Sequence, residues 1–178
     1  DARYYLALCL ATGGAAGDAL EELATLRTIN PHSHRAWQQW GIIRAQSALT
    51  DADLAAAEAS LERAHAINTA ETGALFLLGE VSLLRGHLNT AETRLNAVCQ
   101  SNAKAAGAFY LRAYLAWKAG NTQASSLLLR RAREALGSDW QPRGATSEGD
   151  VRQKQHEEVN LLARFWQDWS GEAQPGTA

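Results

Sequence analysis

Two histidine-containing segments carry residue types that can bind a metal ion. Pro31-His32-Ser33-His34 holds two imidazoles separated by one residue, but no cysteine or carboxylate lies at ligand spacing nearby. A polar turn before a helix is therefore the favoured interpretation. His156-Glu157-Glu158-Val159-Asn160 has the spacing of the zinc-binding helix motif H-E-x-x-H, with Asn160 in place of the second histidine. Because that motif needs both histidines as ligands, we expect no metal site.

The other reactive residue types do not assemble into a nucleophilic or phosphate-binding motif. Cys9 and Cys99 have no adjacent histidine or basic residue that would lower the thiol pKa. The glycine-rich segment 13–17 lacks the preceding strand and the following lysine of a phosphate-binding loop, so it indicates a turn. The basic run 130–133 (Arg-Arg-Ala-Arg) falls in the last turns of a predicted helix, where it complements the helix dipole. We expect a non-catalytic protein without a cofactor or a metal.

Composition narrows the class of protein further. The chain has 178 residues, 46% hydrophobic and 20% charged, with a formal net charge of −2. This balance excludes wholesale disorder and argues against nucleic-acid binding, which needs a basic face. No apolar run approaches the roughly 18 residues of a membrane span. We expect a soluble protein with no membrane or nucleic-acid partner, in the cytoplasm, or in the periplasm if a signal segment was removed.

The chain contains no methionine and enters a helical pattern almost at Asp1. We therefore expect a processed form or a piece of a longer protein.

Apolar and small residues recur along the chain at an interval of 34 residues. At this shift Gly86 aligns with Gly120, and Leu95 aligns with Leu129. Between the second and third copies the interval is 38 residues, which indicates a four-residue insertion near residues 49–53. A recurrence of this length is typical of stacked helical repeats.

Each copy contains two stretches of helical periodicity. The expected helices span residues 3–12, 15–28, 34–48, 53–67, 72–85, 88–101, 104–119 and 121–136. Gly41 and Gly79 stand inside two of these helices, where glycine costs about 1 kcal/mol relative to alanine. We therefore expect two helices to approach closely at these positions.

Parts of the pattern W-x2-L-G-x2-Y, then A-x3-F, then P, recur among the copies. Its first part is matched by Trp37-x2-Trp40-Gly41 and Leu75-x2-Leu78-Gly79, and its second part by Ala19-x3-Leu23, Ala57-x3-Leu61 and Ala91-x3-Leu95. The fourth copy departs from it, with Phe109-x2-Arg112-Ala113 and Ser125-x3-Leu129, and Pro31 is the one closing proline. Through these residues the chain resembles the tetratricopeptide repeat (TPR) family over residues 2–136. The resemblance implies an all-α, right-handed α-solenoid of about four helix pairs.

The family binds partner segments in a groove lined by the first helix of each pair. Carried over onto this chain, the groove positions are Tyr4, Leu8, Arg35, Gln38, Ile42, Gln46, Phe76, Glu80, Leu83, Tyr110, Tyr114, Trp117 and Lys118. Spacings of four and three put Tyr110, Tyr114 and Trp117 on one helix face, where they are expected to be apolar anchors for a partner. Arg35, Glu80 and Lys118 are expected to set its direction.

One TPR subclass clamps the terminal carboxylate of chaperone tails with a Lys/Asn/Lys/Arg set. The corresponding positions here hold Tyr4, Leu8, Gln39, Gly73 and Leu77. None of these is basic, so we do not expect that type of co-chaperone function.

The periodicity stops after Leu136. Residues 137–149 are rich in Gly, Pro and Ser and predict a loop, residues 150–169 predict a ninth helix, and residues 170–178 predict a frayed tail. Val151, Val159, Leu162, Trp166 and Trp169 lie on one stripe of that helix, beside Leu161 and Phe165. It can cap the last repeat, occupy the groove as an internal ligand, or dock onto another copy of the chain.

The leading hypothesis is a scaffold that binds a peptide or partner segment in the groove. The alternative is a regulatory or oligomerisation module of a larger protein that could itself be an enzyme. An enzyme in its own right is disfavoured because no catalytic constellation exists in the sequence.

Overall fold

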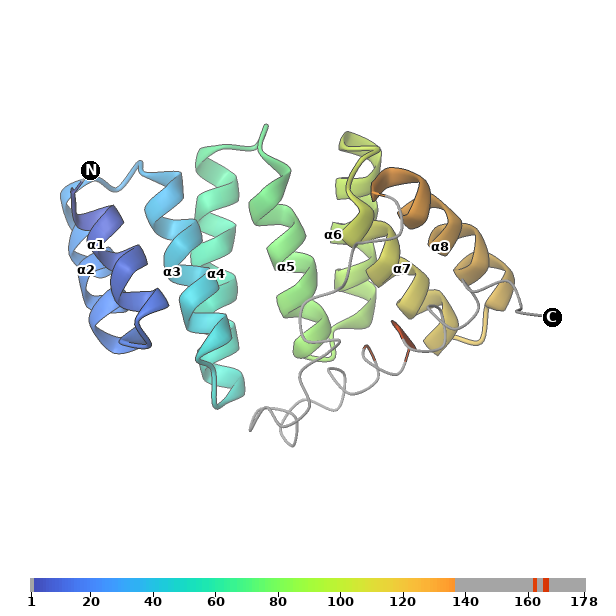
Figure 1. The fold of residues 1–178 in the computed structure, drawn as a ribbon, viewed down its shortest axis with the longest axis horizontal. Helices are drawn as coiled ribbons and strands as arrows, with labels where there is room; N and C mark the ends of the chain where they lie inside the picture. The colour runs from blue at the N-terminus through green and yellow to red at the C-terminus, as the bar shows by residue number, and fades with distance from the viewer. Residues whose placement is uncertain (1, 137–161, 163–164, 167–178) are drawn as a thin grey trace. The chain divides into compact units, whose positions relative to one another are not determined.

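The computed structural model describes residues 2–136 together with Leu162, Phe165 and Trp166. Over residues 2–136 the chain forms helices and turns without strands. The eight helices are α1 (Ala2–Thr12), α2 (Ala16–Ile29), α3 (His34–Gln46), α4 (Asp51–Ile67), α5 (Thr72–Leu84), α6 (Leu88–Ser101), α7 (Ala106–Lys118) and α8 (Thr122–Leu136) (Figure 1). Each predicted helix is present, with its ends within two residues of the prediction. The predicted all-α class is confirmed.

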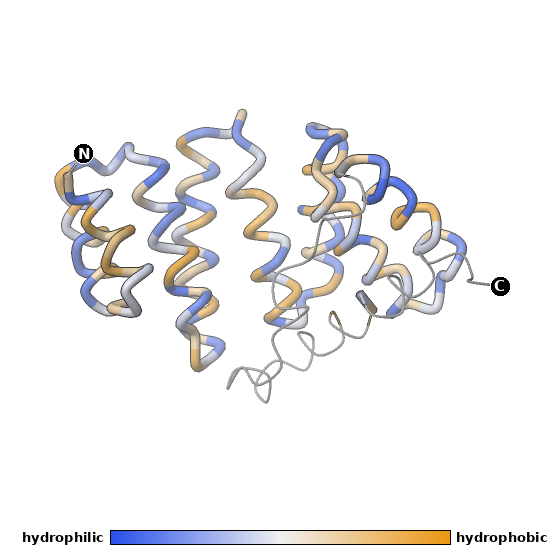
Figure 2. Tube along the Cα trace, in the orientation of Figure 1, coloured by the Kyte–Doolittle hydropathy of each residue, from blue (hydrophilic) through white to orange (hydrophobic). Residues whose placement is uncertain are grey.

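The chain divides into two compact units. The first unit, residues 1–85, contains α1 to α5, and each of these helices packs against the next. The second unit, residues 86–178, contains α6 to α8, with α7 packed against both α6 and α8. Figure 2 shows apolar and polar residues interleaved along the helices of each unit, as amphipathic packing requires.

Small residues allow α3 and α4 to pack closely in the first unit. A Cβ atom added to Gly41 would lie 2.7 Å from Cγ of Leu61 and 3.2 Å from the backbone oxygen of Ala57. Leu61 and Ala57 are both fully buried. The glycine predicted to mark a close helix contact therefore does mark one.

The 34-residue interval is visible in the turns of the backbone. Gly86 follows α5 with φ +74°, and Gly120 follows α7 with φ +79°. This left-handed conformation is strained for residues with a Cβ atom, so glycine ends the first helix of successive copies.

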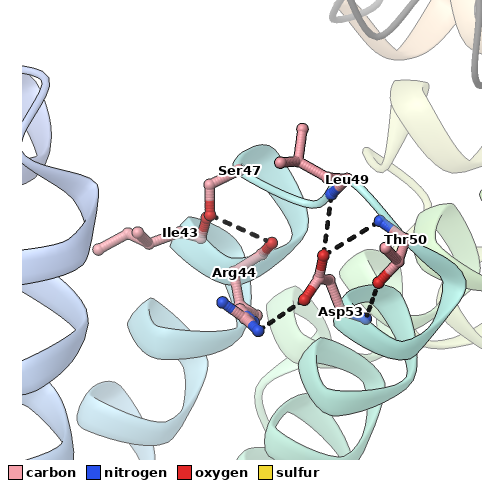
Figure 3. A network of polar contacts seen from close by, with 6 residues as sticks. All are labelled: Ile43, Arg44, Ser47, Leu49, Thr50 and Asp53. Carbon is pink, nitrogen blue, oxygen red and sulfur yellow. Dashed lines mark hydrogen bonds and ion pairs between the residues drawn. The ribbon is translucent and has the colours of Figure 1, made fainter.

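The insertion in the second copy lengthens α4, which has 17 residues against 14 in α2 and in α6. A network of polar contacts holds the turn that leads into it (Figure 3). The Asp53 carboxylate accepts hydrogen bonds from the backbone N–H groups of Leu49 and Thr50, each at 3.0 Å, and pairs with Arg44 at 2.6 Å. In return the Thr50 hydroxyl accepts the Asp53 N–H, which completes a capping box.

The predicted loop, most of the ninth helix and the predicted tail lie outside the described residues. Leu162, Phe165 and Trp166 are helical. No helix within the described part of the chain is both long and apolar enough to cross a membrane.

Candidate functional site

The three aromatic residues predicted as anchors lie together on α7, and we call them the α7 aromatic site (Tyr110, Tyr114 and Trp117). The ring centroids of Tyr114 and Trp117 are 6.2 Å apart. One turn of helix separates each residue from the next, because residues three and four apart lie on the same helix face. The spacing of four and three residues in the sequence therefore puts the three rings on one face of α7.

The α7 aromatic site is covered by the chain's own C-terminal contact residues (Leu162, Phe165 and Trp166). The Phe165 ring centroid lies 5.3 Å from Tyr110, 5.9 Å from Tyr114 and 5.3 Å from Trp117. The Trp166 ring packs on Tyr110 at 6.2 Å. These separations fall in the range of favourable aromatic pairs, and Phe165 is the residue that joins all three rings.

One directional hydrogen bond accompanies the aromatic contacts. The Tyr110 hydroxyl donates to the backbone oxygen of Leu162 at 3.0 Å. Tyr110 and Tyr114 are both 0% exposed, and Phe165 is 4% exposed. Burial is the main reason why the pKa of Tyr110 lies well above its usual value, and the nearby Tyr114 adds to the increase. The tyrosine therefore stays a neutral hydrogen-bond donor, and in this structure no partner can reach either ring.

The remaining groove positions lie on α1, α3 and α5 and at the end of α7, and they differ in exposure. In the first unit, Tyr4 and Leu8 lie on α1, and Arg35, Gln38 and Ile42 lie on α3, with Gln46 at its end; Phe76, Glu80 and Leu83 lie on α5. Arg35 and Gln46 are exposed, Leu83 is buried, and the other six are half-buried. In the second unit, Lys118 is exposed, with its ammonium 5.9 Å from the Tyr114 ring.

One ion pair and one close approach lie between α3 and the start of α5. The Gln38 amide nitrogen lies 3.3 Å from the position that a Cβ atom on Gly73 would occupy. His34 pairs with Glu71 at 3.1 Å. The helices α3 and α5 therefore lie next to each other within the first unit. These two helices carry the half-buried side chains of Ile42 and Phe76.

Sequence reasoning missed a stacked cluster between α2 and α3. The Arg27 guanidinium lies over the rings of Trp37 and Trp40, 4.4 Å and 4.3 Å from their centroids, and donates to the Ser60 hydroxyl at 3.2 Å. Desolvation lowers the pKa of Arg27 from its usual value. The recurring aromatic positions were visible in the sequence, but nothing in it indicated which cation would stack on them.

Among the described residues, the cysteines and histidines are not gathered into a metal-binding group, and the two thiols differ in exposure. Cys9 is exposed, and burial raises the pKa of the half-buried Cys99 thiol despite the nearby Arg112. A raised pKa favours the thiol over the nucleophilic thiolate. Among the described residues, no three His, Cys, Asp or Glu side chains are grouped to hold a metal ion.

Known structures resemble this arrangement, although no protein-family model and no curated protein matches the chain. The thermophilic TPR protein TTC0263 of Thermus thermophilus is 18% identical, with a TM-score of 0.68 over 93% of this chain and 79% of that one. A crystal structure of MamA protein is 20% identical, with a TM-score of 0.67 over 75% of this chain and 70% of that one.

A third structure, MamA residues 41 to the end from Desulfovibrio magneticus RS-1, is 14% identical with a TM-score of 0.66. It matches over 75% of this chain and 73% of that one. At these identities the likeness establishes the fold. Paired helices, glycine turns 34 residues apart and these structural matches together show that the chain has the tetratricopeptide-repeat fold.

Proposed function

We propose that this chain is a non-catalytic protein-interaction scaffold that binds a segment of a partner protein on the first helices of its repeats. The TPR fold supports this role, because stacked helix pairs present side chains from successive first helices to a single ligand. Such proteins bind through surfaces rather than through a reactive centre.

The observation that carries the proposal is the mixture of side chains on α1, α3 and α5. Leu8, Ile42 and Phe76 are apolar yet only half-buried, although each belongs to a different helix of the first unit. Arg35 and Glu80 add one charge of each sign to the same helices. Apolar anchors with flanking charges are what a binding surface needs for affinity and for direction.

Partner capture with surface variants tests this proposal. Ile42→Ser combined with Phe76→Ser should reduce capture of the chain's cellular partners at least tenfold, because half-buried anchors provide much of the binding free energy. Leu127→Ser is the matched control, since Leu127 is an apolar residue of α8 that is 54% exposed. Equal capture by the double variant and the control, with unchanged helicity in both, would rule out this surface.

The α7 aromatic site and Lys118 were predicted as a further part of the same groove. In the structure a partner can reach Tyr110 and Tyr114 only after Phe165 leaves them. The proposal therefore uses the half-buried and exposed positions of the first unit as the binding surface, and it leaves out the α7 rings that Phe165 covers.

A further inference from the structure

The contact between α7 and the C-terminal contact residues has the composition of a helix-recognition site. Leu162 and Phe165 are three residues apart, and Leu162 and Trp166 are four apart, so all three project from one face of a helix. They contribute one aliphatic and two aromatic side chains, of which Leu162 and Phe165 are almost completely buried, at 8% and 4% exposure. Recognition of amphipathic helices uses anchors at these spacings.

The receiving surface on α7 is complementary to this pattern. Tyr110, Tyr114 and Trp117 contribute three rings around the single ring of Phe165. Tyr110 also provides a hydrogen-bond donor, and it is directed at a backbone oxygen rather than at a side chain. The hydroxyl donor therefore recognises the position of the bound backbone, and the three rings recognise the side chains that pack on them.

We propose that the α7 aromatic site is a binding site for an amphipathic helix of the pattern Leu-x-x-Phe-Trp, and that the chain's own Leu162, Phe165 and Trp166 occupy it as a built-in competitor. A partner helix with the same pattern binds after it displaces them. This inference rests on the proposed function, because it concerns another first-helix face of the same repeats.

The strength of the competition follows from the connectivity of the chain. Leu162, Phe165 and Trp166 belong to the same chain as α7, so their contact with it is intramolecular, and an intramolecular ligand can reach an effective concentration on the order of 1 mM. For a helix whose dissociation constant in the absence of competition is about 10 μM, the tethered copy weakens binding of a free copy about 100-fold. Weakening the tethered copy should restore most of that affinity.

Fluorescence anisotropy with a labelled synthetic peptide of residues 158–170 tests the proposal on the full chain. The Phe165→Ala chain should bind this peptide at least tenfold more tightly than the wild-type chain does. Adding Trp117→Ala to that variant should remove the gain, because Trp117 contacts Phe165 directly. A control peptide with alanine at positions 162, 165 and 166 should bind neither chain.

Circular dichroism shows whether Phe165→Ala remains folded. If it loses helicity, Trp166→Ala replaces it, since the Trp166 side chain is only half-buried. Equal peptide affinity for the wild-type chain and the folded variant would overturn the proposal, and so would equal affinity for the control peptide. A loss of melting temperature in the variant without any gain in peptide binding would show that the C-terminal contact residues are only a structural cap.

Size-exclusion chromatography separates the occupant on the same chain from a second copy. A wild-type chain that is monomeric at micromolar concentration supports the proposal. A wild-type dimer that Phe165→Ala converts to a monomer would overturn it in favour of docking between copies. The peptide titration depends on Trp117, whereas the capture experiment depends on Ile42 and Phe76, so failure of one inference is distinguishable from failure of the other.

Discussion

Replacing Gly41 with alanine tests the packing of the first unit. Two effects of opposite sign compete at this position. Alanine is favoured over glycine inside a helix by about 1 kcal/mol. The added Cβ atom would lie 2.7 Å from Cγ and 2.9 Å from Cδ2 of Leu61, and 3.2 Å from the Ala57 carbonyl oxygen.

The clash should outweigh the gain in helix propensity. Leu61 is completely buried, and the third contact is a backbone atom of α4, so the Cβ atom has no flexible side-chain end to push aside. Overpacking of a core costs about 1–3 kcal/mol, and this geometry belongs at the upper end of that range. Subtracting the propensity gain leaves a net loss of about 2 kcal/mol, or roughly 4–8 °C in melting temperature for a chain of this length.

Gly17→Ala is the matched control for this prediction. Gly17 also lies in a helix, but nothing is within 4 Å of a Cβ atom built on it. Gly17 is the second residue of α2, where the preference for alanine is weaker than in a helix interior, so alanine there should leave the melting temperature unchanged or raise it slightly. A double-mutant cycle of Gly41→Ala with Leu61→Ala should show the loss at Gly41 shrinking once Leu61 is truncated. A Gly41→Ala chain that melts at or above the Gly17→Ala chain would refute the reasoning.

Three further predictions concern polar contacts. In a urea titration, Arg85→Met should lower the free energy of unfolding by about 1–3 kcal/mol, because the carboxylates of Asp51 and Glu58 lose their guanidinium partner and the Glu58 side chain is only 12% exposed. Arg3→Met is the control: it breaks an exposed ion pair with Glu22 and should cost less than about 1 kcal/mol. Hydrogen bonds from Leu49, the larger cause, and from Thr50 lower the pKa of the Asp53 carboxyl. The ionised carboxylate therefore stabilises the fold above about pH 4, and this stabilisation is lost as the pH falls through the lowered pKa. Melting curves between pH 3 and 6 should therefore show a steeper acid loss for the wild type than for Asp53→Asn. Arg27→Lys should cost about 1 kcal/mol and change tryptophan fluorescence, since an ammonium cannot stack flat on Trp37 and Trp40 as a guanidinium does; an unchanged melting curve and spectrum would contradict the stacking argument.

The helices and their class were predictable from local patterns. Helical periodicity and the glycine turns act within one or two helical turns, and the 34-residue interval is a repetition of these local patterns, so all three can be found in the sequence directly. The same holds for the alignment of Tyr110, Tyr114 and Trp117 on one face of α7. The close approach at Gly41 was also predictable, because a glycine inside a helix needs a packing reason.

Contacts between distant segments could not be predicted in this way. The Arg85 contacts with Asp51 and Glu58 span 34 and 27 residues, and the Arg27 contact with Ser60 spans 33. Many surface cations were available for each of these pairings, and the sequence carries no periodicity that selects one of them. The choice depends on which side chains the helix packing brings within a few ångströms.

The sequence by itself determined the helices, their repetition and the apolar character of residues on both α7 and the C-terminal segment. It left open whether that segment caps the last repeat, fills the groove or joins another copy, because all three bury the same apolar side chains. Only the tertiary structure decided that Phe165 lies against Tyr110, Tyr114 and Trp117. The physical reason is that hydrophobic burial is non-directional, so geometry and the bond from Tyr110 to Leu162 select the contact.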